Sequence, residues 1–152
     1  MNSKSWNDIT VFVVALNRLP YERAALSIID DYCQHWGYNL FVLREASRQN
    51  VKKAHPSWLK LLCHRFVYCR FALCWDLDLL PVSRLPQIDE ALNKDQLNMV
   101  VDTSITLGEK SPFVNFRYNG GLIGIPRTMA DFMERIYYQY APGTYPSYEQ
   151  YY

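Results

Sequence analysis

Apolar and polar positions along the chain divide it into strand-like and helix-like segments. Residues 9–16 are a continuous apolar run rich in β-branched side chains, which is typical of a strand buried on both faces. The following segments alternate between helical spacing and short apolar runs, which predict a helix at 21–36, a strand at 38–43, a helix at 57–68 and a strand at 71–75. Pro20 suits a first helical position, and Gly37 fits the C-terminal stop of the first helix.

The second half of the chain continues the alternation less regularly. We expect a short helix at 86–93, a strand at 97–101, a loop at 103–114, a strand at 122–125 and an amphipathic helix at 128–140. The β-α-β-α-β order at the start implies right-handed crossovers between parallel strands. The pattern therefore predicts one α/β domain over residues 1–152, with a Rossmann-like mixed, mostly parallel sheet flanked by helices.

Composition narrows the class of protein. The chain has 152 residues, 49% of them apolar, and a net charge of +1, which suits one globular domain and gives no electrostatic case for binding nucleic acid. Its four cysteines form no CxxC and no Cys/His metal spacing, so we expect free thiols in a reducing cytoplasm. The apolar run at 9–16 is too short to span a bilayer and lacks a basic leader, so we expect neither a transmembrane segment nor a signal peptide.

Two carboxylates, Asp76 and Asp78, directly follow the apolar run at 71–75. In an ideal strand, alternate side chains share a face, which would bring these two carboxylates together. Adjacent carboxylates repel each other, and a divalent cation relieves that cost. Hard oxygen ligands suit Mg²⁺ or Mn²⁺, and such ions keep coordination positions open for substrate phosphates. The alternative is a strand end with two solvated aspartates.

Other polar residues follow the predicted strands. Asn17 and Arg18 follow the first strand, and Arg44 follows the second. Ligands of parallel sheets bind beyond the carboxyl ends of the strands, so we expect these residues and the Asp76/Asp78 pair to border one site. On the helix at 57–68, Lys60 and His64 are four residues apart and are expected on the polar side.

Three motifs in order resemble the GT-A type of nucleotide-sugar glycosyltransferase. The first is Trp-Asp-Leu-Asp-Leu-Leu-Pro at 75–81, preceded by a helix that carries a lysine. The second is Tyr-Asn-Gly-Gly-Leu-Ile-Gly-Ile-Pro at 118–126, similar to a turn that enters a strand in that superfamily. The third is Tyr-Glu-Gln at 148–150, similar to an acidic residue and Gln that open a late helix.

The resemblance implies a metal-dependent transfer of a sugar from a nucleoside diphosphate, expected to be UDP, to a hydroxyl of a carbohydrate or glycoprotein acceptor. Asp78 would bind Mn²⁺ or Mg²⁺, and Asp76 would share the metal or hold the donor ribose. Glu149 would be the general base or line the donor sugar, or else be an ordinary exposed carboxylate. The remaining substrate-binding residues would be Asn17, Arg18, Lys60, Leu77, Asn119, Gly120 and Gly121. Lys60 would reach the diphosphate or structure the aspartate turn, or else be an ordinary exposed lysine.

The chain also departs from the GT-A pattern. Many members add a late histidine as a metal ligand, but no histidine follows His64 here. The sequence stops soon after Glu149, which fits either a compact member or a domain cut from a longer protein. Two alternatives stay open: a non-catalytic domain that binds sugar nucleotides, and a phosphohydrolase of the haloacid-dehalogenase type. The latter commonly has Thr, Ser or Val at the position that Leu80 occupies.

Overall fold

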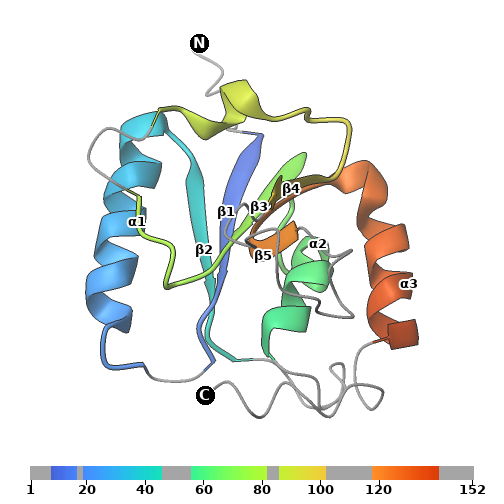
Figure 1. The fold of residues 1–152 in the computed structure, drawn as a ribbon, viewed down its shortest axis with the longest axis horizontal. Coiled ribbons are helices and arrows are strands. Elements are labelled where there is room, and N and C mark those ends of the chain that lie inside the picture. The colour runs from blue at the N-terminus through green and yellow to red at the C-terminus, as the bar shows by residue number, and fades with distance from the viewer. Residues whose placement is uncertain (1–7, 17–18, 46–55, 82–85, 102–117, 141–152) are drawn as a thin grey trace, which may run out of the picture.

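A computed structural model describes residues 8–16, 19–45, 56–81, 86–101 and 118–140. Its elements, in chain order, are β1 (Ile9–Val14), α1 (Glu22–Trp36), β2 (Asn39–Leu43), η1 (Pro56–Leu62), α2 (Cys63–Phe66), β3 (Phe71–Trp75), η2 (Ile88–Ala91), β4 (Asn98–Val101), β5 (Tyr118–Pro126), η3 (Arg127–Met129) and α3 (Ala130–Tyr140). The elements named η are 3₁₀ helices. Figure 1 shows α1 on one side of the sheet, with α2 and α3 on the other.

The five strands form one mixed sheet in the order β2-β1-β3-β5-β4. β1 pairs in parallel with β2 and β3, whereas β5 pairs antiparallel with β3 and β4. The predicted α/β class, a Rossmann-like mixed sheet flanked by helices, is confirmed. The chain moves from β1 to β2 on one side and then returns to β3 on the other. This reversal places a topological switch point at the carboxyl ends of β1 and β3, where ligands of such sheets bind.

The first helix forms where the sequence predicts it, except that it begins at Glu22 after an N-cap at Tyr21, so Pro20 precedes the helix. Ala25, Ile29 and Cys33 recur every four residues and are buried against the sheet. Gly37 ends the helix in the left-handed conformation, with φ of 71°, which glycine adopts without a side-chain clash. The amide of Tyr38 then donates to the carbonyl of Cys33 at 2.8 Å, which satisfies one of the last helical carbonyls.

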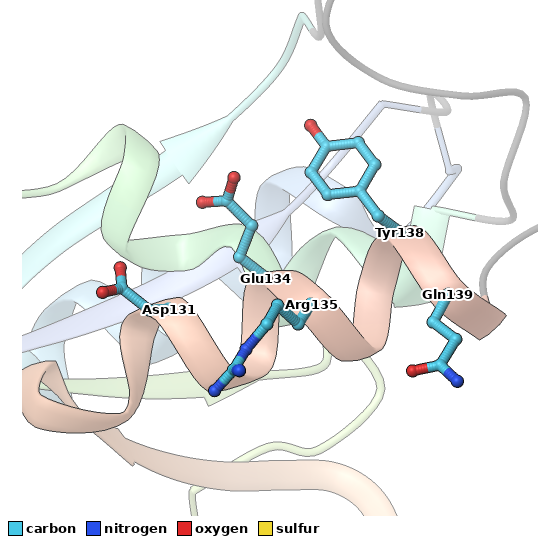
Figure 2. A pocket seen from close by; sticks show the side chains of 5 residues that line it. All are labelled: Asp131, Glu134, Arg135, Tyr138 and Gln139. Atoms are coloured by element: carbon cyan, nitrogen blue, oxygen red, sulfur yellow. The ribbon is translucent and has the colours of Figure 1, made fainter.

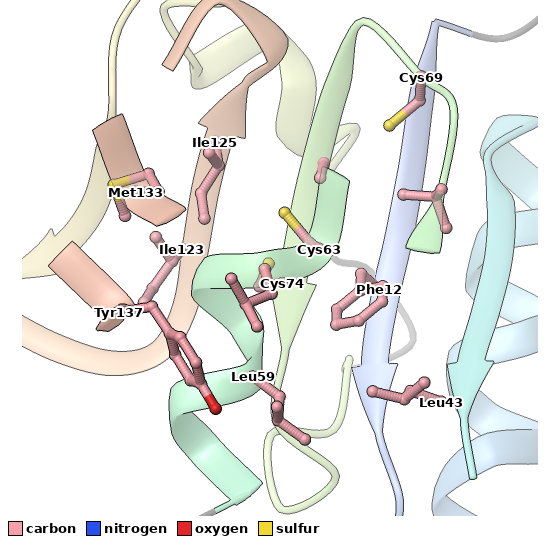
Figure 3. Close-up of a cluster of buried hydrophobic side chains, with 13 residues drawn as sticks. Phe12, Leu43, Leu59, Cys63, Cys69, Cys74, Ile123, Ile125, Met133 and Tyr137 are labelled. Carbon is pink, nitrogen blue, oxygen red and sulfur yellow. The ribbon is translucent and has the colours of Figure 1, made fainter. Parts of the chain in front are cut away.

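Each face of the sheet carries its own core. The face shown in Figure 3 packs against η1, α2 and α3, with Phe12 and Cys74 from the strands meeting Leu59 and Tyr137 from the helices. The other face packs against α1 and the segment around η2, through Val11, Leu73, Trp75 and neighbouring side chains. Alternate residues of β1 and β3 therefore pack into opposite cores. Both strands are buried on both faces, as predicted for β1.

The segment at 57–68 differs from the expected α-helix, because most of it is the 3₁₀ helix η1. Within this 3₁₀ segment Lys60 lies between the buried Leu59 and Leu62, and its own side chain is 3% exposed. The prediction that Lys60 lies on the polar side was therefore wrong. A 3₁₀ helix has three residues per turn, so the 3.6-residue spacing assumed for an α-helix does not assign its faces.

Other boundaries shift without changing the topology. The strand expected at 122–125 is longer and includes the Asn-Gly-Gly motif as part of β5. The short helix expected at 86–93 is reduced to the single 3₁₀ turn η2. Within the described ranges, no helix combines the length and the apolar character needed to cross a bilayer.

Candidate functional site

The two aspartates of the DxD motif lie in a tight turn directly after β3. The amide of Asp76 donates to the carbonyl of Gly121 at 2.8 Å, which extends the pairing of β3 with β5 by one residue. The amide of Leu79 then donates to the carbonyl of Asp76 at 3.1 Å and closes a four-residue turn. Because the strand ends at Trp75, strand alternation does not govern Asp76 and Asp78. We call residues 76–79 the DxD turn.

The three residues of the motif have different surroundings. Leu77 is 6% exposed and packs into the core beneath α1, so its side chain faces away from solvent. Asp78 is exposed, and it takes part in none of the salt bridges of the described residues. The Asp76 side chain is 39% exposed. The turn thus buries its middle leucine and presents two carboxylates near solvent.

Lys60 connects the DxD turn to the Asn-Gly-Gly motif. Its Nζ lies 2.6 Å from Oδ1 of Asp76 and donates to the carbonyl of Gly120 at 2.7 Å. An ammonium group that is 3% exposed needs such partners, because burying an unpaired charge is costly. The interpretation of Lys60 as an exposed helix lysine is therefore wrong. Residues 60, 76 and 120 are far apart in sequence, yet this one side chain contacts both motifs.

Gly120 is extended and open. A methyl group built at Gly120 meets no heavy atom of the described residues within 4 Å, and among these residues Gly37 alone has positive φ. Neither backbone strain nor internal crowding therefore requires glycine at position 120. The side chain of Asn119 lies outside the described residues, although its backbone belongs to β5.

Arg44, which follows β2, is engaged at the same edge of the sheet. Its guanidinium forms an ion pair with Glu22, a largely buried residue in the first turn of α1. The pair ties the carboxyl end of β2 to the start of the helix that follows β1. Asn17, Arg18 and Glu149 lie outside the described residues, so their assignments stay predictions.

Sequence reasoning missed one contact of the DxD turn. The indole Nε1 of Trp75 donates to the carbonyl of Leu79 at 2.6 Å. Trp75 is 3% exposed, and its ring lies 5.5 Å from that of Tyr32 in α1. The signal that could have revealed the contact is a tryptophan directly before the motif, since a buried indole N–H needs an acceptor nearby.

The described cysteines and histidines do not form a second site. All four cysteines are free and buried, and burial raises the pKa of the Cys33 thiol to about 12 and of the Cys74 thiol well above its ordinary value. Such thiols stay protonated and unreactive. Among the described residues, no group of three or more His, Cys, Asp or Glu side chains is arranged to hold a metal.

A hollow of about 590 Å³ lies over α3 and is unrelated to the DxD turn. Figure 2 shows that the five side chains that line it, Asp131, Glu134, Arg135, Tyr138 and Gln139, all project from this one helix. Glu134 and Tyr138 also hold Arg65 of α2 through hydrogen bonds. An open hollow along a single helix lacks polar groups converging from several elements, so we favour the DxD turn as the candidate site.

Comparison with known proteins supports the fold. The chain resembles a solved structure described as the crystal structure of a glycosyltransferase involved in the glycosylation of the major capsid of PBCV-1. The TM-score is 0.63 over 93% of this chain and 71% of that chain, with 15% sequence identity. No protein-family model matches the sequence, and neither does any curated protein. The chain therefore shares its fold with a glycosyltransferase.

Proposed function

We propose that the protein is a metal-dependent glycosyltransferase that moves a sugar from a nucleoside diphosphate, a UDP-sugar, to an acceptor hydroxyl. One observation carries the proposal: Lys60 joins the DxD turn to the Asn-Gly-Gly strand at the carboxyl end of β3. This is the edge of the sheet where ligands of the fold bind. The fold shared with a glycosyltransferase supports glycosyl transfer as the reaction class.

The donor set of the DxD turn fits Mn²⁺ or Mg²⁺. Asp78 is an exposed carboxylate in a closed turn, and Asp76 is partly exposed two residues before it. Carboxylate oxygens are hard ligands that suit these ions, and so few protein ligands leave positions for the donor phosphates. Asp78 would be the main ligand, and Asp76 would share the ion or hold the donor ribose. When bound, the ion offsets negative charge on the departing diphosphate.

The protein groups around the turn would orient the donor. Lys60 fixes the Asp76 carboxylate, which limits the positions available to that side chain. The space beside Gly120 would admit the donor sugar, with Asn119 and Gly121 bordering it. Asn17 and Arg18, which follow β1, would contact the nucleotide. Glu149 would accept the proton of the acceptor hydroxyl, which requires a distance of about 2.6–3.2 Å.

Turnover assays distinguish the proposal from its alternatives. The protein is incubated with Mn²⁺ and a panel of nucleotide sugars, and the release of free nucleoside diphosphate is followed with and without sugar acceptors. Release that acceptors accelerate supports the transferase. Binding without release indicates a non-catalytic sugar-nucleotide domain. Phosphate release from small phosphoesters indicates a phosphohydrolase.

The space beside Gly120 gives a separate test of where the sugar binds. A Cβ atom at Gly120 meets no heavy atom of the described residues within 4 Å, so the fold should persist in Gly120→Val. If the donor sugar occupies that space, the variant should weaken binding of the nucleotide sugar more than binding of the nucleoside diphosphate. Equal affinities in the variant and the parent for both ligands would place the sugar elsewhere.

The proposed base is tested by Glu149→Gln. Removing a general base lowers turnover by about a hundredfold or more while leaving nucleotide binding intact. Parent-like transfer by this variant would exclude Glu149 from catalysis without affecting the donor site.

A further inference from the structure

We infer that Trp75 is a positioning residue, whose indole N–H sets the shape of the DxD turn and thereby the place of Asp78. The inference deepens the proposed function, on which its ligand-binding part rests. Its structural part, the bracing of the turn, stands on the hydrogen bond from Trp75 Nε1 to the carbonyl of Leu79 at 2.6 Å.

The backbone of Asp78 lies between two fixed points. On one side, the Leu77 side chain is buried in the same core as Trp75. On the other, both backbone groups of Leu79 are engaged: its amide donates to Asp76 at 3.1 Å, and its carbonyl accepts from Trp75 at 2.6 Å. Asp78 itself forms no salt bridge with any described residue, so the backbone on either side of it is what limits where its carboxylate can reach.

The Trp75 ring is itself held rigidly. It is 3% exposed, and it packs against Tyr32 of α1 at a ring-centroid distance of 5.5 Å. The Tyr32 hydroxyl donates to the carbonyl of Pro86 at 2.9 Å, and the amide of Ile88 donates back to that hydroxyl at 3.2 Å. Tyr32 thus contacts both the residue before the DxD turn and the segment beyond it, and these contacts hold the indole ring in place.

Trp75 and Lys60 brace the turn from opposite faces of the sheet. Trp75 belongs to the core beneath α1, whereas Lys60 comes from η1 on the face covered by α2 and α3. Lys60 holds the first carboxylate of the motif, and Trp75 holds the last backbone carbonyl of the turn. A ligand site built in this way needs little rearrangement when its ligand binds, which favours affinity.

Tryptophan is needed at this position for its directional donor. Phenylalanine would keep an aromatic ring against Tyr32 but has no N–H, so the carbonyl of Leu79 would lose its partner. The net contribution of one such hydrogen bond corresponds to about a three- to tenfold change in a local equilibrium. The loss should be confined to the turn, because the strand pairing of β3 does not depend on the indole.

The test compares Trp75→Phe with Trp36→Phe, a matched control at the end of α1. Hydrogen exchange is measured by NMR at the Leu79 amide in the turn and at the Leu73 amide in the centre of β3. We expect Trp75→Phe to speed exchange at Leu79 by about three- to tenfold relative to Leu73, with no such change in the control. Unchanged exchange at Leu79, or an equal rise at Leu73, would overturn the bracing role.

The binding arm uses calorimetry with UDP and Mn²⁺. If the parent binds UDP, Trp75→Phe should weaken binding by a similar factor, and parent-like affinity despite faster exchange at Leu79 would overturn the positioning role. If the parent binds no UDP, the proposed function fails, and the exchange result alone decides on the bracing of the turn. If the variant does not fold, the indole proton of Trp75 in the parent decides: protection from exchange supports the hydrogen bond, and exchange as fast as in a free indole refutes it.

Discussion

The Nζ of Lys60 lies 2.6 Å from Oδ1 of Asp76 and also donates to the carbonyl of Gly120 at 2.7 Å. One buried cation therefore holds the start of the DxD turn and the backbone of β5 together. The pair is asymmetric: Lys60 is almost completely buried, whereas Asp76 reaches solvent. Loss of the cation would leave the carbonyl of Gly120 without this donor.

We predict that Lys60→Met lowers the free energy of unfolding by about 1–3 kcal/mol, the usual cost of a buried acceptor that loses its donor. Urea denaturation measures the change. Arg70→Met is the control, because the Arg70–Asp8 pair spans 3.8 Å between exposed side chains. Such surface pairs contribute at most about 1 kcal/mol. A Lys60→Met variant no less stable than the control would contradict the role of Lys60 in holding the two motifs together.

The glycines of β5 should respond differently to substitution. A methyl group at Gly124 would lie 2.5 Å from Cζ of Phe71, whose ring is fully buried, and 3.3 Å from Cβ of Asn98. We predict that Gly124→Ala costs about 1–3 kcal/mol of stability, as overpacking in a core does. Gly120→Ala, whose methyl group meets no described atom within 4 Å, should change stability by no more than about 0.5 kcal/mol. Thermal unfolding of both variants checks the contrast, and equal melting temperatures would refute it.

His64 should make stability depend on pH. Burial lowers the pKa of His64, the charge of Arg127 lowers it further, and the hydrogen bond to the carbonyl of Ile125 only partly offsets this. The unfolded chain therefore binds a proton near pH 6.5 that the folded protein accepts only at lower pH. The contribution of neutral His64 to the free energy of unfolding is thus fully present above about pH 6.5 and is lost as the pH falls below it.

Denaturation curves between about pH 7 and pH 5 test this expectation. His64→Gln should flatten the pH dependence, whatever its effect on stability at neutral pH. His35→Gln, which changes an exposed histidine of α1, should retain the parent slope. The same slope in all three proteins would show that His64 is not the group responsible.

Much of the fold could be predicted from local sequence patterns. The continuous apolar run of β1, the four-residue spacing of α1 and the glycine at its end each depend on neighbouring residues alone. The pitch of the 56–62 segment does not depend on neighbouring residues alone. A 3₁₀ helix and an α-helix differ by only one residue in the spacing of their hydrogen bonds, so tertiary packing decides between them. Periodicity based on 3.6 residues therefore placed Lys60 on the wrong side.

The candidate site could be predicted from the sequence only in part. The DxD motif can be recognised from the sequence, because two aspartates that follow a buried strand are unusual in an apolar context. The contacts that organise it are long-range: Lys60 meets Asp76 and Gly120 only because η1, β3 and β5 pack together. The Trp75 contact is local but depends on how the turn closes, which strand alternation does not describe. These contacts could be identified only once the fold was known.

Calorimetric titration of UDP tests whether the DxD turn is a metal-dependent donor site. It is carried out with Mn²⁺ and with a chelator, on the parent, on Asp78→Asn and on Asp131→Asn, which alters an exposed aspartate in the hollow over α3. We expect Mn²⁺ to strengthen UDP binding in the parent and in Asp131→Asn, and Asp78→Asn to fold normally but lose this strengthening. Equal UDP affinity with Mn²⁺, with chelator and in Asp78→Asn would contradict a metal-dependent donor site at the DxD turn.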